Sequence, residues 1–137
     1  MAGRLLDLTT PHKEASMKPV LWMATLGLLG AAPAYAQDAV KVDPKHYKVE
    51  LENDQVRVLR IHYGAGEKSV MHSHPASVAV FLTDGKVKFT TPDGKTKEAS
   101  AKAGEVQWEA AGPHLPANVG AEPFDLILVE LKSAPAK

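Results

Sequence analysis

The chain has 137 residues, and its 16 Lys and Arg side chains balance its 16 Asp and Glu side chains, so the formal net charge at pH 7 is zero. This length suffices for one domain with a hydrophobic core. The balanced charge does not favour nucleic acid or an anionic membrane surface as a partner, because both select a basic protein face. The chain has no cysteine, which excludes disulfides, thiolate metal ligands and cysteine nucleophiles.

The first predicted element is an export signal. Lys18 supplies a short positive region, residues 20–32 form an apolar run, and Ala34-Tyr35-Ala36 has the small-x-small pattern of a cleavage site. The run is too short to span a bilayer, which needs about 20 apolar residues. We therefore expect residues 1–36 to comprise an upstream extension and a signal helix, with residues 37–137 as a periplasmic or secreted domain. A buried amphipathic helix is the alternative.

The natural start of the signal is expected at Met17, because residues 1–16 carry charges and a Thr-Thr-Pro break that are unusual ahead of an export signal. After cleavage the domain is not expected to have a membrane partner.

Strand patterns separated by turns follow from Tyr47 onward. Residues 55–63 are rich in β-branched side chains, residues 77–82 are apolar, and Asp84-Gly85 is a strong hairpin signal. Further strands are expected at residues 86–90, 95–101, 105–109, 114–119 and 123–131. No segment after residue 40 sustains a helical period, so the predicted class is all-β, a sandwich or a barrel.

Two histidines, His72 and His74, stand two positions apart. Side chains at i and i+2 share one face of a strand, so the two imidazoles are placed to share a metal ion. With His114 they form a set of three neutral nitrogens, which suits a divalent transition metal with open coordination positions. The alternatives are a solvated strand face for His72 and His74, and an ordinary loop histidine at His114.

The spacing around the first two histidines resembles the first motif of the cupin superfamily, G-x5-H-x-H-x3-4-E-x6-G. Cupins are small jelly-roll barrels with a metal in the mouth. Gly66, His72, His74 and Gly85 match this motif, whereas Val78 stands at the position of its glutamate.

The second cupin motif, G-x5-P-x-G-x2-H-x3-N, is matched by Gly104, Gly112, His114 and Asn118. Ala110 replaces its proline, and the spacing from the first glycine to the histidine is one residue shorter.

The resemblance covers about residues 45–132. It implies an all-β cupin double-stranded β-helix, a jelly-roll barrel of the RmlC-like type. Within the superfamily, the chain is similar to small exported cupins linked with β-alanine degradation, a link that implies little about the reaction.

The resemblance implies a metal held by His72, His74 and His114. Iron is the expected metal, with zinc, nickel, copper and manganese as alternatives. Valine at the glutamate position leaves the metal its full charge, which favours an anionic chelating ligand but weakens metal affinity. A barrel that binds no metal is the alternative. The expected pocket residues are Val78, Val80, Phe89, Trp108 and Asn118.

Two functions remain open on these grounds. The first is an Fe(II)-dependent, dioxygenase-like enzyme acting on a small chelating organic acid. The second is a non-catalytic exported protein that binds a metal ion or another small molecule. A purely structural cupin that forms a homodimer is a third possibility. Residues 95–101 offer an edge strand for it, although their charges oppose promiscuous pairing.

Overall fold

The computed structural model describes residues 37–133, so the predicted signal helix and cleavage site lie outside the described residues. The elements are α1 (Ala39–Val42), β1 (Tyr47–Glu52), β2 (Val56–Tyr63), β3 (His72–His74), β4 (Ser77–Phe81), β5 (Gly85–Thr90), β6 (Thr96–Ala101), β7 (Val106–Glu109), β8 (Gly112–Asn118) and β9 (Phe124–Leu131). No helix within this part of the chain is long and apolar enough to cross a membrane.

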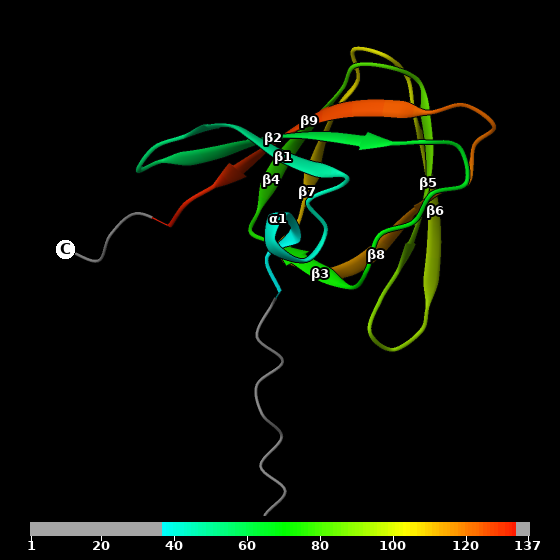
Figure 1. Cartoon of the computed structure of the whole chain (residues 1–137), viewed down its shortest axis with the longest axis horizontal. Helices are drawn as coiled ribbons and strands as arrows, with labels where there is room; N and C mark the ends of the chain where they lie inside the picture. Colours follow the sequence, from blue (N-terminus) through cyan, green and yellow to red (C-terminus); the bar gives the residue numbers. More distant parts are fainter. Residues whose placement is uncertain (1–36, 134–137) are drawn as a thin grey trace, which may run out of the picture. The chain divides into compact units, whose positions relative to one another are not determined.

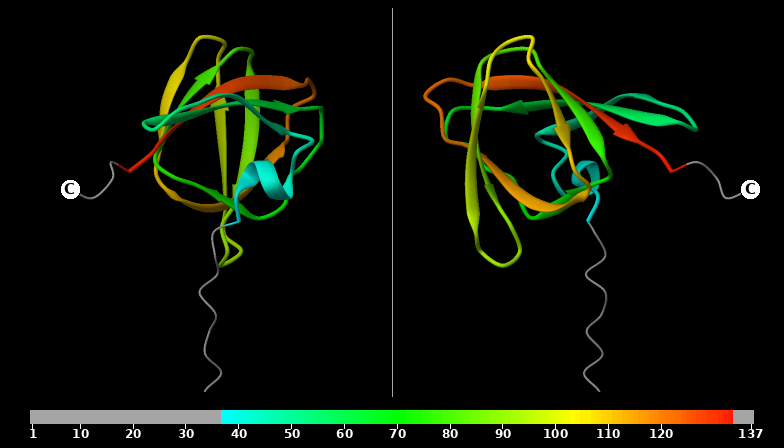
Figure 2. Two further views of the ribbon diagram at one scale, coloured as in Figure 1. Left: turned by 60° about the vertical axis from the view of Figure 1, so that its left-hand side comes forward. Right: turned by 180° about the vertical axis from the view of Figure 1, so that it is seen from behind.

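The strands form two antiparallel sheets that curve around one interior (Figures 1 and 2). The five-stranded sheet has the order β1-β2-β9-β4-β7, and the four-stranded sheet has the order β3-β8-β5-β6. The last strand of the chain therefore lies between β2 and β4, which makes the topology a jelly roll and not a meander. The predicted all-β class is confirmed.

Alternation along the strands builds the core. On β9, Phe124, Leu126 and Leu128 are buried, and the residues between them lie on the opposite face. Leu59 and Ile61 of β2 are buried in the same way. Burying one such side chain contributes about 1.5–3 kcal/mol to the free energy of folding. These side chains fill the space between the two sheets, so their burial holds the sheets together.

The start of β8 differs from the prediction. The strand was predicted to begin at residue 114, yet β8 begins at Gly112, and Pro113 pairs with Ser73 of β3. The Ser73 N–H points away from β8 and donates to the Gln37 carbonyl. Ser73 and Pro113 therefore form a pair without ladder hydrogen bonds, and proline's missing N–H costs nothing there.

Candidate metal centre

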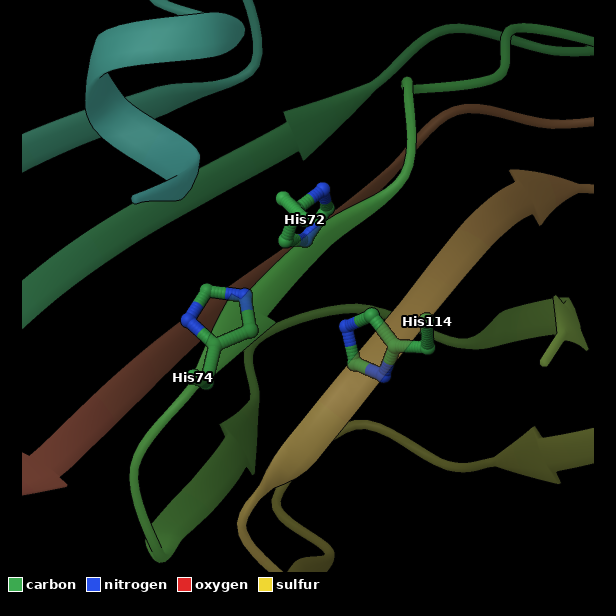
Figure 3. A group of neighbouring side chains, drawn as sticks. All are labelled: His72, His74 and His114. Carbon is green, nitrogen blue, oxygen red and sulfur yellow. The ribbon is translucent and has the colours of Figure 1, made fainter. Parts of the chain in front are cut away.

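The three histidines meet on two neighbouring strands (Figure 3). His72 and His74 lie on β3, and His114 of β8 stands directly opposite His72 in the antiparallel register. One ligand nitrogen of each ring lies within 4.8 Å of the others. Nitrogens about 2.1 Å from a common ion stand at most about 4.2 Å apart, so small side-chain rotations would bring this set to binding distance. The donor set therefore fits one transition-metal ion.

His72 is held by its Nδ1 atom. This atom lies 2.8 Å from the Val70 carbonyl, to which it donates, and the ring is almost fully buried. Because Nδ1 carries the proton, the lone pair of the neutral ring is on Nε2. This atom lies 3.0 Å from the Tyr47 hydroxyl. Burial lowers the pKa of His72 to about 4, so the ring is neutral at pH 7, as a metal ligand must be.

His74 is held by a buried carboxylate. Its Nδ1 lies 2.6 Å from Glu130 Oε1, while Glu130 Oε2 accepts a hydrogen bond of 2.5 Å from Arg57 Nε. Arg57 also pairs with Asp38. Burial alone would raise the pKa of Glu130, but the contacts with His74 and Arg57 outweigh it and the pKa lies below its ordinary value. Such a carboxylate fixes the ring and raises its basicity as a ligand.

His114 completes the group from the other strand. Its ring centroid lies 5.0 Å from that of His72 and 5.4 Å from that of His74, and Phe89 packs at 5.1 Å. The pKa of His114 is lowered to about 3. Burial is the larger cause, and the two neighbouring imidazoles add to it.

These pKa values predict how the stability of the metal-free protein depends on pH. His72 and His114 take up protons near pH 6.5 when unfolded, but only near pH 4 and pH 3 when folded. The unfolded state therefore binds more protons below pH 6.5, and the free energy of unfolding should fall as the pH drops, at about 1.4 kcal/mol per unit for each ring. Urea unfolding with a chelator present, between pH 7.5 and 5, would measure this fall. Replacing His114 by phenylalanine should remove part of it, and a flat profile for the parent protein would contradict the assignment.

A small cavity and an open groove adjoin the centre. The cavity has a volume of about 50 Å³ and is lined mainly by apolar side chains, with His74, His114 and Glu109 in its wall. The groove, of about 1010 Å³, lies between the β5–β6 and β7–β8 turns. Phe89, Glu109 and His114 line both spaces, so this is where the histidines meet the outside.

Solved structures resemble this domain. A cupin domain from Bordetella pertussis Tohama I superposes with a TM-score of 0.59 at 24% identity, covering 64% of this chain and 92% of that one. A double-stranded β-helix protein from Klebsiella pneumoniae gives a TM-score of 0.51 at 24% identity, covering 66% and 78%. The domain has a cupin fold. No family model and no curated protein matches the sequence.

The cupin fold and the histidine cluster together fit a metal-binding cupin. The structure brings together the three predicted ligands. The link with β-alanine degradation stays a prediction.

The expected pocket residues need correction. On β4 the buried positions are Ser77, Ala79 and Phe81, and the last two line the cavity. Val78 and Val80 therefore lie on the outer face of the cupin barrel. Val78 is not beside the histidines, because its neighbours Ser77 and Ala79 are the inward-facing residues of β4.

Trp108 and Asn118 also lie outside the cavity, whereas Phe89 lines it as expected. Trp108 pairs with Val78 on the outer face and is 62% exposed, although it borders the open groove. Asn118 is buried, and its amide donates to the carbonyls of Gly64 and Glu122. It therefore ties together two loops of the barrel.

Sequence reasoning missed three residues at this centre: Tyr47, Glu109 and Glu130. Glu130 had a detectable signal in the alternation of β9. It follows Leu126 and Leu128 at the same two-residue spacing, so it faces the interior, where a carboxylate needs a partner. Tyr47 and Glu109 carried no comparable signal. Glu109 lies in the cavity wall, and burial raises the pKa of its carboxyl.

Proposed function

We propose that this domain binds one divalent transition metal through His72, His74 and His114. The observation that carries the proposal is the commitment of the Nδ1 atoms of His72 and His74 to the Val70 carbonyl and to Glu130. Both rings are thereby oriented as ligands that bind through Nε2. Three neutral ligands favour an anionic partner that completes the coordination shell.

We further propose a dioxygenase-like reaction on a small chelating organic acid, with iron as the metal. Bound iron would activate dioxygen and polarise the chelated acid. The cavity of about 50 Å³ has room for only the chelating end of such a molecule, so the remainder would lie in the groove. Lys97 lines this groove and offers a positive charge to an anionic ligand.

Tyr47 has a defined part in this proposal. Its hydroxyl lies 3.0 Å from His72 Nε2 and 2.7 Å from the Tyr63 hydroxyl. Once Nε2 binds a metal it no longer accepts a hydrogen bond, so the Tyr47 hydroxyl becomes free to donate to an oxygen of the bound acid. Burial raises the pKa of Tyr47 well above its ordinary value, which keeps the phenol protonated as a donor.

Oxygen uptake by the iron-loaded protein tests the reaction. We expect uptake with at least one member of a panel of small 2-oxo acids, hydroxy acids and diketones. Replacing Tyr47 by phenylalanine should lower kcat by roughly 10-fold or more while leaving the iron content unchanged, because it removes one donor and keeps the ring. An iron-filled protein that consumes no oxygen with any of these compounds would contradict the enzymatic proposal.

The second candidate is a non-catalytic protein that binds a metal ion or a small ligand. The small size of the cavity beside His74 and His114 favours it, because the cavity does not hold a whole organic substrate. Elemental analysis of protein from its natural source separates the two candidates, since zinc or copper in place of iron favours simple binding. Export of the domain remains a prediction from the segment before Gln37.

A further inference from the structure

The strand that carries two of the three histidines is short and lies at the edge of its sheet. β3 comprises only His72–His74, and its one neighbour in the four-stranded sheet is β8. A three-residue strand with a single neighbour has few hydrogen bonds, so its local stability is low. Further contacts are therefore needed to keep the two imidazoles in place.

Residues 37–43 cover the open edge of β3. We call them the α1 segment, which comprises Gln37, the helix α1, and Asp38 and Asp43 at the two ends of the helix. The Ser73 N–H donates to the Gln37 carbonyl at 2.9 Å, and Asp38 forms a parallel bridge with Ser73. The helix lies against β1 and β3 (Figure 1). The α1 segment thus occupies the place of a neighbouring strand.

Asp38 connects the α1 segment to His74. Its carboxylate lies 2.6 Å from Nη1 of Arg57, whose Nε donates to Glu130 at 2.5 Å. Glu130 in turn accepts from His74 Nδ1 at 2.6 Å. The Asp38 and Arg57 side chains are mostly buried, so water screens their contact little. Asp38 therefore provides one of the two contacts that fix the Arg57 guanidinium behind Glu130.

Asp43 connects the other end of the helix to His72. The Ser69 hydroxyl donates to Asp43 Oδ2, and Ser69 Oγ lies 3.3 Å from His72 Nδ1. Both side chains of this connection are buried, because Asp43 is 8% exposed and Ser69 is 5% exposed. Burial alone would raise the pKa of Asp43, but the hydrogen bonds with Ser69 and His46 outweigh it, and the pKa lies below its ordinary value. Asp43 is therefore a carboxylate at pH 7.

The charge of Asp43 decides the direction of these hydrogen bonds. A carboxylate only accepts, so the Ser69 proton is committed to Asp43 and the Ser69 lone pairs face the His72 N–H. This contact adds to the Val70 carbonyl, which accepts from the same nitrogen. Both contacts keep the proton of His72 on Nδ1 and the lone pair on Nε2, the atom proposed to bind the metal.

We propose that the α1 segment sets the metal affinity of the centre, with Asp38 as a positioning residue for His74 and Asp43 as a positioning residue for His72. This inference rests on the proposed metal site. Each aspartate reaches its ring through intermediate side chains, and the two connections share no residue. Because both start from one four-residue helix, a displacement of α1 changes the orientation of both rings at once.

Calorimetric titration of the full chain with zinc tests the proposal. Asp38→Asn and Asp43→Asn should each weaken zinc affinity about 5- to 30-fold, which is less than the 10- to 100-fold typical of a group that touches the ligand itself. Asp84→Asn is the matched control, since Asp84 also accepts a backbone N–H and pairs with a lysine, Lys102. Asp84 lines a separate hollow with Gly120, so this variant should bind zinc like the parent protein.

Nitrogen-15 NMR of the imidazoles in the metal-free protein gives a readout that general destabilisation would not produce. Asp43→Asn should increase the Nε2–H tautomer of His72 and leave His74 unchanged. An asparagine amide can donate to Ser69, which allows the hydroxyl to turn toward His72 Nδ1. Asp38→Asn should instead shift the resonances of His74 alone, because its connection passes through Glu130.

Ser69→Ala provides a second variant on the Asp43 connection. It should weaken zinc affinity about as much as Asp43→Asn, and combining the two should cause no further loss, because both remove the same contact with His72. A parent protein that binds no zinc would overturn the proposed function and this inference with it. A parent that binds zinc no more tightly than the Asp38 and Asp43 variants, or variants that perturb both rings alike, would overturn the role of the α1 segment alone.

Discussion

Replacing His74 by alanine should abolish stoichiometric metal binding. The binding free energy of structural zinc sites with four ligands is about 10–16 kcal/mol, so one ligand contributes roughly 3 kcal/mol. This corresponds to about a hundredfold to a thousandfold in affinity. His74 is also the ring oriented by Glu130, so its loss leaves that carboxylate without one of its two donors. Elemental analysis and calorimetric titration of the purified variant would measure the effect.

His62 offers the matched control for this experiment. Its side chain is 56% exposed and faces Asp125, and it belongs to no histidine cluster of the described residues. His62→Ala should therefore keep the metal content of the parent protein. A His74→Ala variant that retains one metal ion per chain would show that the ligands are other residues. His114→Ala tests the ligand on β8 in the same way.

Replacing Glu130 by glutamine should weaken both the fold and the metal site. The carboxylate accepts from His74 Nδ1 with one oxygen and from Arg57 Nε with the other. Glutamine has a single acceptor and no charge, so one donor is left unpaired in a buried place. Breaking a buried ion pair costs about 3–5 kcal/mol, and the remaining Arg57–Asp38 pair reduces this to roughly 2–4 kcal/mol. Metal affinity should fall about 10- to 100-fold.

Urea unfolding and metal titration of Glu130→Gln would measure these losses. Glu52→Gln is the appropriate control, because the Glu52–Lys132 pair lies on the surface and such pairs contribute about 0–1 kcal/mol. Equal unfolding midpoints for both variants, with unchanged metal affinity, would mean that Glu130 does not support His74.

Local pattern was enough to predict most strands and the metal-ligand candidates. His72 and His74 are two positions apart, so their shared face follows from the geometry of any strand. The alternation on β9 is a signal of the same local kind. The hairpin predicted at Asp84-Gly85 is wrong, because β4 and β5 on either side of it belong to different sheets and do not pair. Val78 shows the limit of this reasoning. Its inward orientation was inferred from its place in a motif, but the inward residues of β4 are its neighbours Ser77 and Ala79.

The residues that support the centre could not be assigned to it from the chain alone. Glu130 is 56 positions from His74, and only the pairing of β9 with β4 brings its carboxylate to the ring. Tyr47 likewise reaches His72 across 25 positions.

The amino-acid sequence by itself determined the all-β class, most strand positions and the shared face of His72 and His74, because these depend on neighbours within a few residues. The tertiary structure alone decided the convergence of His114 with that pair, the Glu130–Arg57 support and the outward orientation of Val78 and Val80. These depend on cross-strand register, which is set by the packing of the whole barrel and not by any one segment.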